Sequence, residues 1–107
     1  MIDSPVAEFI KIARCDEVAE GAGKVVEGNG RKIALFNTRG EFYAIANECL
    51  HEGASLGEGM VYGTRVVCPL HGWEYDFTTG CNVDDPSIKL RCFKVQIVEG
   101  DVLTLAE

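Results

Sequence analysis

Short apolar segments recur along the whole chain, and several of them alternate apolar with polar residues. The alternation is clearest in residues 93–97, Phe-Lys-Val-Gln-Ile, where every second residue is apolar. A period of two is typical of a strand that buries one face. The predicted strands are rich in β-branched and aromatic residues, and they are Phe9–Ile12, Lys24–Glu27, Lys32–Asn37, Phe42–Ala46, Thr64–Val67, Trp73–Phe77, Lys89–Val98 and Val102–Leu105.

Turn signals separate these segments at intervals of about eight to twelve residues, most of them built around glycine. Asn29-Gly30 lies between two apolar segments, which is a strong signal for a two-residue hairpin turn. Only the stretch from Cys15 to Glu20 has the pattern of a helical turn, and Asp16 is placed to cap its N-terminus. Short strands at even spacing predict an all-β fold of the sandwich or barrel type.

Length and composition indicate one globular domain. The chain has 107 residues, of which 47% are hydrophobic, so it can bury a modest core. It contains no apolar run of the roughly eighteen residues that a membrane span needs. The start, Met1 to Pro5, has neither a basic region nor an apolar region of the signal-peptide kind. We therefore expect a soluble, cytoplasmic protein.

The formal net charge of −7 narrows the choice of partners. A negative surface repels phosphate backbones, so nucleic acid is not an expected partner. The same charge would steer the chain toward a basic protein surface, although it would also serve solubility alone.

Two short motifs hold the only two histidines of the chain. They are Cys49-Leu50-His51 and Cys68-Pro69-Leu70-His71, with sixteen residues between His51 and Cys68. Each motif follows a predicted strand and opens a loop rich in Gly or Pro, so the two loops could meet over one site. We expect residues 46–86 to form a small subdomain on a base made of residues 1–45 and 87–107 of the single domain 1–107.

Two thiolates and two imidazoles suit zinc, iron or an iron–sulfur cluster. Structural zinc sites space their ligands differently, because they usually pair Cys with Cys and His with His. A catalytic Cys–His dyad needs only one thiol and one imidazole, and it has no use for two equivalent pairs. The remaining choice is a [2Fe–2S] cluster with two Cys on one iron and two His on the other.

The two motifs resemble the signature of Rieske proteins, in which C-x-H is followed by C-x-x-H-G; here the second motif continues as His71-Gly72. The resemblance is sharp from about Ala44 to Gly80. It implies a Rieske-type antiparallel β-sandwich or barrel base with the cluster-binding subdomain at one end. It also implies one [2Fe–2S] cluster, with Cys49 and Cys68 on the buried iron and His51 and His71 on the outer iron.

The resemblance also bears on the surroundings of the cluster. Respiratory Rieske proteins have a disulfide between their cluster loops, and the matching positions here are Ala54 and Leu70. They carry a serine donor where this chain has Trp73, and a tyrosine donor that matches Tyr75. Fewer hydrogen bonds to sulfur imply a reduction potential near the low end of the Rieske range.

The remaining residues favour a carrier over an enzyme. A Rieske oxygenase needs a second iron site with two further histidines, and none remains. Gly21-Ala22-Gly23 does not extend into a dinucleotide-binding motif. The three other cysteines, Cys15, Cys81 and Cys92, are predicted to be small buried apolar residues.

The chain resembles the ferredoxin component of bacterial aromatic ring-hydroxylating dioxygenase systems. That resemblance implies a soluble carrier of one electron between a flavin-dependent reductase and a terminal oxygenase, without a catalytic residue of its own. One alternative is the small Rieske-like subunit of an NADH-dependent nitrite reductase. The other is an interaction module that holds zinc.

Overall fold

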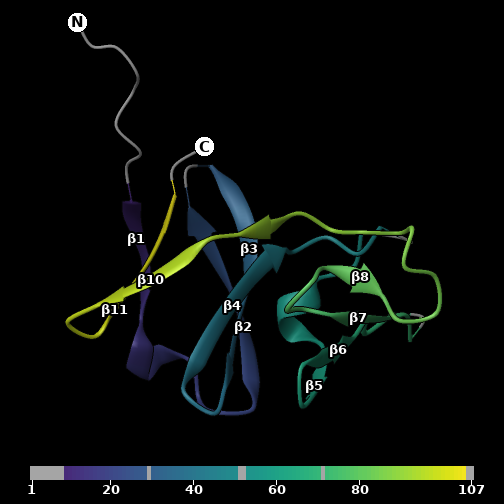
Figure 1. Ribbon diagram of the computed structural model, residues 1–107, viewed down its shortest axis with the longest axis horizontal. Helices are drawn as coiled ribbons and strands as arrows, with labels where there is room; N and C mark the ends of the chain where they lie inside the picture. Colours follow the sequence, from purple (N-terminus) through teal and green to yellow (C-terminus); the bar gives the residue numbers. More distant parts are fainter. Residues whose placement is uncertain (1–8, 29, 51–52, 71, 106–107) are drawn as a thin grey trace, which may run out of the picture.

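The computed structural model describes residues 9–28, 30–50, 53–70 and 72–105, and in this part of the chain it consists of three antiparallel sheets (Figure 1). The first sheet has the order β1 (Phe9–Arg14), β11 (Asp101–Leu105), β10 (Val95–Val98). The second has the order β2 (Ala22–Gly28), β3 (Arg31–Thr38), β4 (Glu41–Ala46), β9 (Cys92–Phe93). The third has the order β5 (Met60–Tyr62), β6 (Arg65–Val67), β7 (Glu74–Asp76), β8 (Cys81–Asn82). The predicted all-β class is confirmed.

The predicted hairpin joins β2 to β3. Gly28 pairs with Arg31, which leaves two residues in the turn. Gly30 has φ +79°, a left-handed conformation that a two-residue hairpin turn requires and that glycine adopts without strain. Asn29 lies outside the described residues.

Strand β3 is buried on both faces because it contributes to two cores. Ile33 and Leu35 belong to a core cluster that also contains Ala13, Val18, Val26, Ala44 and Val102. Ala34 and Phe36, which point to the opposite face, belong to a second cluster that extends to the third sheet. There the ring of Phe36 stacks on that of Phe77, with centroids 4.4 Å apart. This strand therefore fixes the third sheet to the rest of the molecule.

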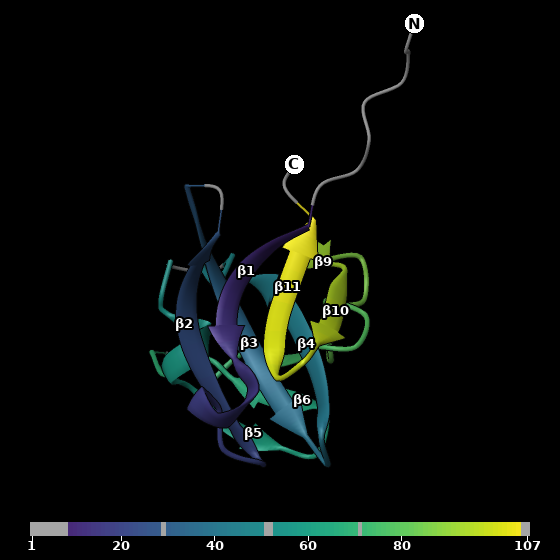
Figure 2. The same ribbon diagram turned by 90° about the vertical axis from the view of Figure 1, so that its left-hand side faces the viewer.

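The predicted strand Lys89–Val98 is wrong as a single element. It contains two short strands that belong to different sheets: β9 pairs with β4, and β10 pairs with β11. Figure 2 shows β10 beside β11, with β9 near the end at which β10 begins. Lys94, between the two strands, has a carbonyl that accepts a 2.8 Å hydrogen bond from the Thr104 hydroxyl. That bond holds the chain where it passes from one sheet to the other.

The predicted cap at Asp16 is also wrong. The helical turn is a 3₁₀ helix over Cys15–Glu17, and its N-cap residue is Arg14. The carboxylate of Glu17 accepts a hydrogen bond from the backbone N–H of Arg14 at 2.8 Å. The acidic side chain that closes this turn is therefore that of Glu17 and not that of Asp16. The same hydrogen bond is the main cause that lowers the pKa of Glu17.

Strands β5 and β8 were not predicted, because they have three and two residues and lie beside glycines or turns. A second 3₁₀ helix, Leu56–Glu58, precedes β5. None of the described residues forms a helix that could span a membrane.

Candidate metal centre

The first cysteine loop begins where β4 ends and is closed by backbone hydrogen bonds. The N–H of Cys49 donates to the carbonyl of Ala54 at 2.9 Å, and the N–H of Gly53 donates to the carbonyl of Cys49 at 2.7 Å. Gly53 has φ +73°. A side chain at this position would strain the backbone, so glycine allows the chain to reverse direction here.

The second cysteine loop repeats this pattern after β6. The N–H of Cys68 donates to the carbonyl of Trp73 at 2.6 Å, and the N–H of Gly72 donates to the carbonyl of Cys68 at 3.1 Å. Gly72 has φ +80°, and it follows its cysteine by four residues, as Gly53 does in the first loop. Two loops that are distant in sequence therefore have the same pattern of backbone hydrogen bonds, and each presents one buried cysteine.

Asn47 anchors the first loop. Its side-chain carbonyl accepts the N–H of Gly57 at 2.8 Å, and its amide group donates to the Ser55 hydroxyl at 3.1 Å. Its backbone carbonyl accepts the N–H of Leu56 at 2.8 Å. The residue is 4% exposed, so these groups lie away from bulk water. Sequence reasoning missed Asn47; the available signal was a polar residue between an apolar strand and the motif cysteine.

Close packing at Gly59 holds the strand that leads to the second cysteine. An added Cβ at Gly59 would overlap the carbonyl oxygen of Val67 and would lie 3.0 Å from a methyl group of Val66. Val67 immediately precedes Cys68 and pairs with Met60. Only glycine therefore lets the β5–β6 pair approach this closely.

The two motif thiols belong to the same buried cluster. Cys49 and Cys68 are each 2% exposed, and both lie in the core that also contains Tyr75 and Phe77. Thiolates are the soft ligands that iron–sulfur clusters require. Burial among apolar core side chains excludes water from these two sulfur atoms.

Tyr75 is the hydrogen-bonding partner of the first thiol. Its hydroxyl lies 3.5 Å from the Sγ of Cys49 and accepts the backbone N–H of Leu50 at 3.3 Å. Burial, followed by the hydrogen bond to Cys49, raises the pKa of Tyr75 to about 12. The hydroxyl therefore keeps its proton at neutral pH and can donate to a thiolate sulfur.

The predicted histidine ligands, His51 and His71, lie outside the described residues. Their neighbours Leu50 and Leu70 are more than half exposed, at 56% and 53%. Each loop thus has a buried cysteine and an exposed leucine that directly precedes the histidine in the sequence.

The other three cysteines do not share the burial of the motif pair. Cys15 and Cys81 are half-buried, and Cys92 is exposed, so the prediction of a buried apolar role is wrong for Cys92. Although the residue as a whole is exposed, partial desolvation of its thiol is the main cause that raises the pKa of Cys92.

A β domain that presents two buried thiols on matching loops has the features of a protein that holds a metal cluster between the loops. The model of the Rieske [2Fe-2S] domain matches residues 8–94. The chain therefore belongs to the Rieske [2Fe-2S] domain family. The predicted cofactor, one Rieske-type [2Fe–2S] cluster, is confirmed by this match, which also speaks against the zinc alternative.

Relatives point to an electron carrier. The chain is 36% identical over 90 residues to the ferredoxin component of the naphthalene 1,2-dioxygenase/salicylate 5-hydroxylase systems of Ralstonia sp., covering 83% of this chain and 86% of the relative. Its fold matches a chain in the complex of reduced oxygenase and oxidized ferredoxin in carbazole 1,9a-dioxygenase, with TM-score 0.83, 30% identity and coverage of 92% and 94%. The predicted class, an electron-transfer component without catalysis of its own, is confirmed.

One further structure shows the fold alone. The putative NADH-dependent nitrite reductase small subunit from Mycobacterium tuberculosis has TM-score 0.84 but 22% identity, with coverage of 94% of this chain and 96% of that one. The same scaffold thus occurs in a dioxygenase ferredoxin and in a nitrite reductase small subunit, two of the three classes considered from the sequence.

Proposed function

We propose that this chain is the ferredoxin component of a multicomponent aromatic-ring-hydroxylating oxygenase system. It takes one electron at a time from a flavin-dependent reductase and delivers it to a terminal oxygenase. The observation that carries the proposal is the similarity to a dioxygenase ferredoxin over more than four-fifths of both chains. The nitrite reductase alternative has support from the fold only.

The proposed ligands are Cys49 and Cys68 on the inner iron and His51 and His71 on the outer iron. Two observations support the assignment of the cysteines: both thiols are buried, and the two loops have the same pattern of backbone hydrogen bonds. The spacing of the motifs supports the histidine half. A bound cluster of this type supplies reversible one-electron chemistry.

The protein's own residues set the properties of that site. The Tyr75 hydroxyl lies 3.5 Å from the Cys49 sulfur, and as a donor to a thiolate ligand it would favour the state with more negative charge on the cluster. Neutral imidazole ligands in place of two thiolates raise the potential into the range of about −150 to +300 mV. Both effects favour acceptance of an electron from a flavin.

The leucines beside the histidines fit a transient docking face. Leu50 and Leu70 are exposed apolar side chains, one on each cysteine loop. A small apolar contact of this kind suits an encounter that must form and separate in each turnover. We further propose that residues 46–86 act as the cluster-binding unit, with residues 1–45 and 87–107 as its base, and that the protein works in the cytoplasm.

Reconstitution tests the proposal. Purified chain is mixed with a flavin-dependent reductase, NADH and a terminal oxygenase of the naphthalene dioxygenase type, and oxidised aromatic product is measured. Product formation should depend on the presence of this chain. It should be lost with the variant Cys68→Ser, which lacks a proposed cluster ligand. Product formation at the same rate with Cys68→Ser, or none with the intact holoprotein, would contradict the proposal.

A further inference from the structure

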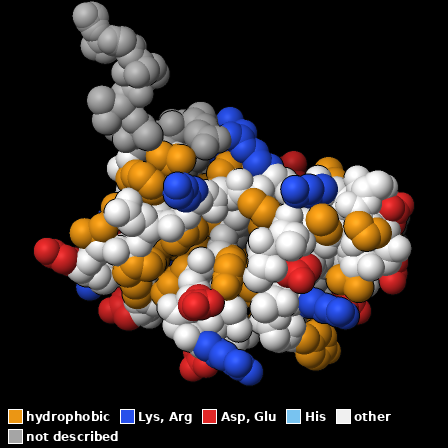
Figure 3. Space-filling view, in the orientation of Figure 1, with side chains coloured by type: hydrophobic (Ala, Val, Ile, Leu, Met, Phe, Trp, Pro, Cys, Tyr) orange, Lys and Arg blue, Asp and Glu red, His pale blue; other side chains and the backbone are white. Residues whose placement is uncertain are grey.

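The β5 pocket, of about 570 Å³, lies along the second cysteine loop. Its walls come from the end of the second 3₁₀ helix, from β5, from the end of β6 and from the loop itself. Figure 3 shows hydrophobic side chains at the lower edge of the molecule, where Figure 1 places β5. The pocket therefore borders the loop that carries a proposed iron ligand. The lining residues are Glu58, Gly59, Met60, Tyr62, Val67, Cys68, Pro69 and Gly72.

Two exposed side chains of one strand form the apolar wall of the β5 pocket. Met60 and Tyr62 are 63% and 57% exposed, and residues two apart on a strand point to the same face. The Tyr62 hydroxyl donates a hydrogen bond to the Met60 Sδ at 2.8 Å, which holds the two side chains together. Val67, which pairs with Met60, and Pro69 continue this wall toward the loop. The result is an apolar surface with an aromatic ring that is open to a partner.

Glu58 makes one end of the β5 pocket negative. It is exposed, and it is the one acidic residue of the lining, which contains no basic residue. Within the described part of the chain, no side chain forms an ion pair or a hydrogen bond with its carboxylate. The pocket thus combines an apolar wall with a carboxylate that is available to a cation from outside the chain.

The negative charge of the chain is concentrated in the part that contains this pocket. Residues 46–86 include seven acidic residues and one basic residue, a net charge of −6 with His counted as neutral. Residues 1–45 and 87–107 include ten acidic and nine basic residues, a net charge of −1. During an encounter, this uneven distribution orients residues 46–86 toward a positively charged surface.

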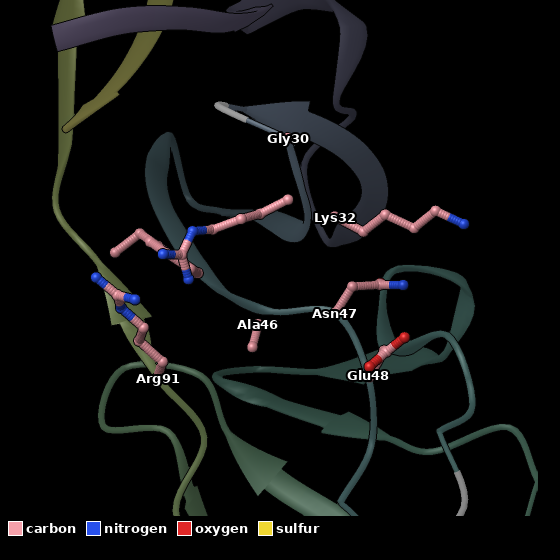
Figure 4. A pocket seen from close by; sticks show the side chains of 8 residues that line it. Gly30, Lys32, Ala46, Asn47, Glu48 and Arg91 are labelled. Carbon is pink, nitrogen blue, oxygen red and sulfur yellow. The ribbon is translucent and has the colours of Figure 1, made fainter. Parts of the chain in front are cut away.

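The pocket beside the first cysteine loop has a different lining. It has a volume of about 470 Å³, and its charged residues are Arg31, Lys32, Arg91 and Glu48. Figure 4 shows Lys32 and Arg91 on opposite sides of this pocket, with Asn47 between them. Like charges repel, so an approaching cation would enter the β5 pocket and not this one.

We infer that the β5 pocket receives an arginine or lysine side chain from the surface of a redox partner protein. The aliphatic part of such a side chain would pack on Met60 and Pro69, and its charged end would lie over the Tyr62 ring and near the Glu58 carboxylate. The inference rests on the proposed function, because an electron carrier must dock with its cluster toward the partner. A side chain held in this pocket would place the partner against the second cysteine loop.

Kinetics with the reductase and with the oxygenase, measured separately, test the acidic end of the pocket. Glu58→Gln removes one negative charge and keeps the size of the side chain. With at least one partner, it should lower kcat/KM by about two- to fivefold at low ionic strength, and added salt should reduce the difference from the wild type. Iron content and visible absorbance should equal those of the wild type, since Glu58 is an exposed residue.

Two variants with the same loss of charge are controls for Glu58→Gln. Glu27→Gln changes an exposed residue of β2 in the base, and Asp84→Asn changes an exposed residue within 46–86 that lies outside the β5 pocket. Each control should lower kcat/KM less than Glu58→Gln does. If Asp84→Asn lowers it as much as Glu58→Gln, the charge acts only at long range and the pocket inference is wrong.

Substitutions of Tyr62 test the aromatic wall. Tyr62→Phe keeps a ring for the cation, whereas Tyr62→Leu keeps an apolar side chain but removes the ring. With the partner that responds to Glu58→Gln, Tyr62→Leu should lower kcat/KM by about two- to fivefold relative to Tyr62→Phe. Equal values for the two Tyr62 variants would contradict a cation over this ring.

Carboxyl labelling of the wild-type holoprotein provides a test that does not depend on the folding of a variant. A carbodiimide with glycine ethyl ester converts accessible carboxylates to amides, and mass spectrometry measures the rate at each site. With a saturating amount of the partner, labelling of Glu58 should slow at least threefold, while that of Glu27 should not change. An unchanged rate at Glu58 with both partners would contradict the inference.

The outcomes separate the two levels of the account. The wild-type chain may couple reductase to oxygenase while Glu58→Gln matches Asp84→Asn and neither partner protects Glu58. In that case the pocket inference is wrong and the proposed function stands. If the wild-type chain transfers no electrons between these proteins, the proposed function itself is wrong.

Discussion

The hydroxyl of Tyr75 lies 3.5 Å from the Sγ of Cys49, and both groups are buried in the same core cluster. Tyr75 is on β7 of the third sheet, whereas Cys49 follows β4 of the second. This contact therefore ties a proposed iron ligand to a strand that the chain reaches more than twenty residues later.

Removal of this hydroxyl should lower the reduction potential. In Tyr75→Phe the thiolate loses a donor that favours the reduced cluster, and a hydrogen bond of about 0.5–1.5 kcal/mol corresponds to about 20–65 mV for one electron. Redox titration followed by visible absorbance measures the change. Tyr43→Phe is the control, because its hydroxyl contacts the carboxylate of Glu41; an equal shift in both variants would contradict a local effect.

The side chain of Asn47 should control retention of the cluster. Asn47→Ala leaves the N–H of Gly57 without its acceptor, which should cost about 1–3 kcal/mol and loosen the first cysteine loop. The rate at which visible absorbance is lost on mild heating should increase.

Asn37→Ala is a matched control for this variant. Asn37 is also a buried asparagine, and it bonds to the Val18 carbonyl and the Gly40 N–H in the base. It should lower the unfolding temperature without releasing the cluster before global unfolding. If both variants release the cluster only when the whole protein unfolds, or both release it before unfolding, Asn47 has only a general structural role.

A methyl group at Gly59 should disturb the second cysteine loop. Gly59→Ala places a Cβ against the Val67 carbonyl, and the displaced backbone should cost about 1–3 kcal/mol. Iron content per chain should fall. Gly63→Ala meets no atom within 4 Å but has φ +56°, so it introduces backbone strain without the contact; iron loss as large in Gly63→Ala as in Gly59→Ala would disprove the packing explanation.

Removal of the cluster should affect the third sheet most. Cys68 lies between β6 and β7, so loss of its metal bond releases a constraint on this sheet, whereas the base sheets have their own core around Ile33 and Leu35. In hydrogen exchange of the apoprotein, amides of β5–β8 should lose more protection than those of β1–β3. A uniform loss across all sheets would argue against residues 46–86 as a separate cluster-binding unit.

The sequence predicted the elements whose signals are local. The β2–β3 hairpin follows from Asn29-Gly30 between apolar segments, and the two cysteine loops follow from their glycines and their place after strands. Lys89–Val98 was predicted as one strand because the alternation continues through Lys94, and only the pairing of β9 with β4 and of β10 with β11 reveals the division.

Features made by distant segments could not be predicted. A pocket of about 470 Å³ beside the first cysteine loop combines residues near positions 31, 47 and 91, so no single stretch of sequence shows it. The anchoring role of Asn47 depends on where the backbone of Gly57 lies, which a sequence pattern does not report. Tyr75 was assigned as a donor only by resemblance, and its contact with Cys49 gives that assignment a structural reason.

In the proposed site, two histidines and two cysteines hold one [2Fe–2S] cluster. Because His51 and His71 are the only histidines of the chain, ¹⁵N-histidine labels no other residue. Pulsed electron paramagnetic resonance of the reduced, labelled holoprotein should show strong couplings from two histidine nitrogens bound to the cluster. A spectrum with no directly bound histidine nitrogen, or with only one, would contradict the account.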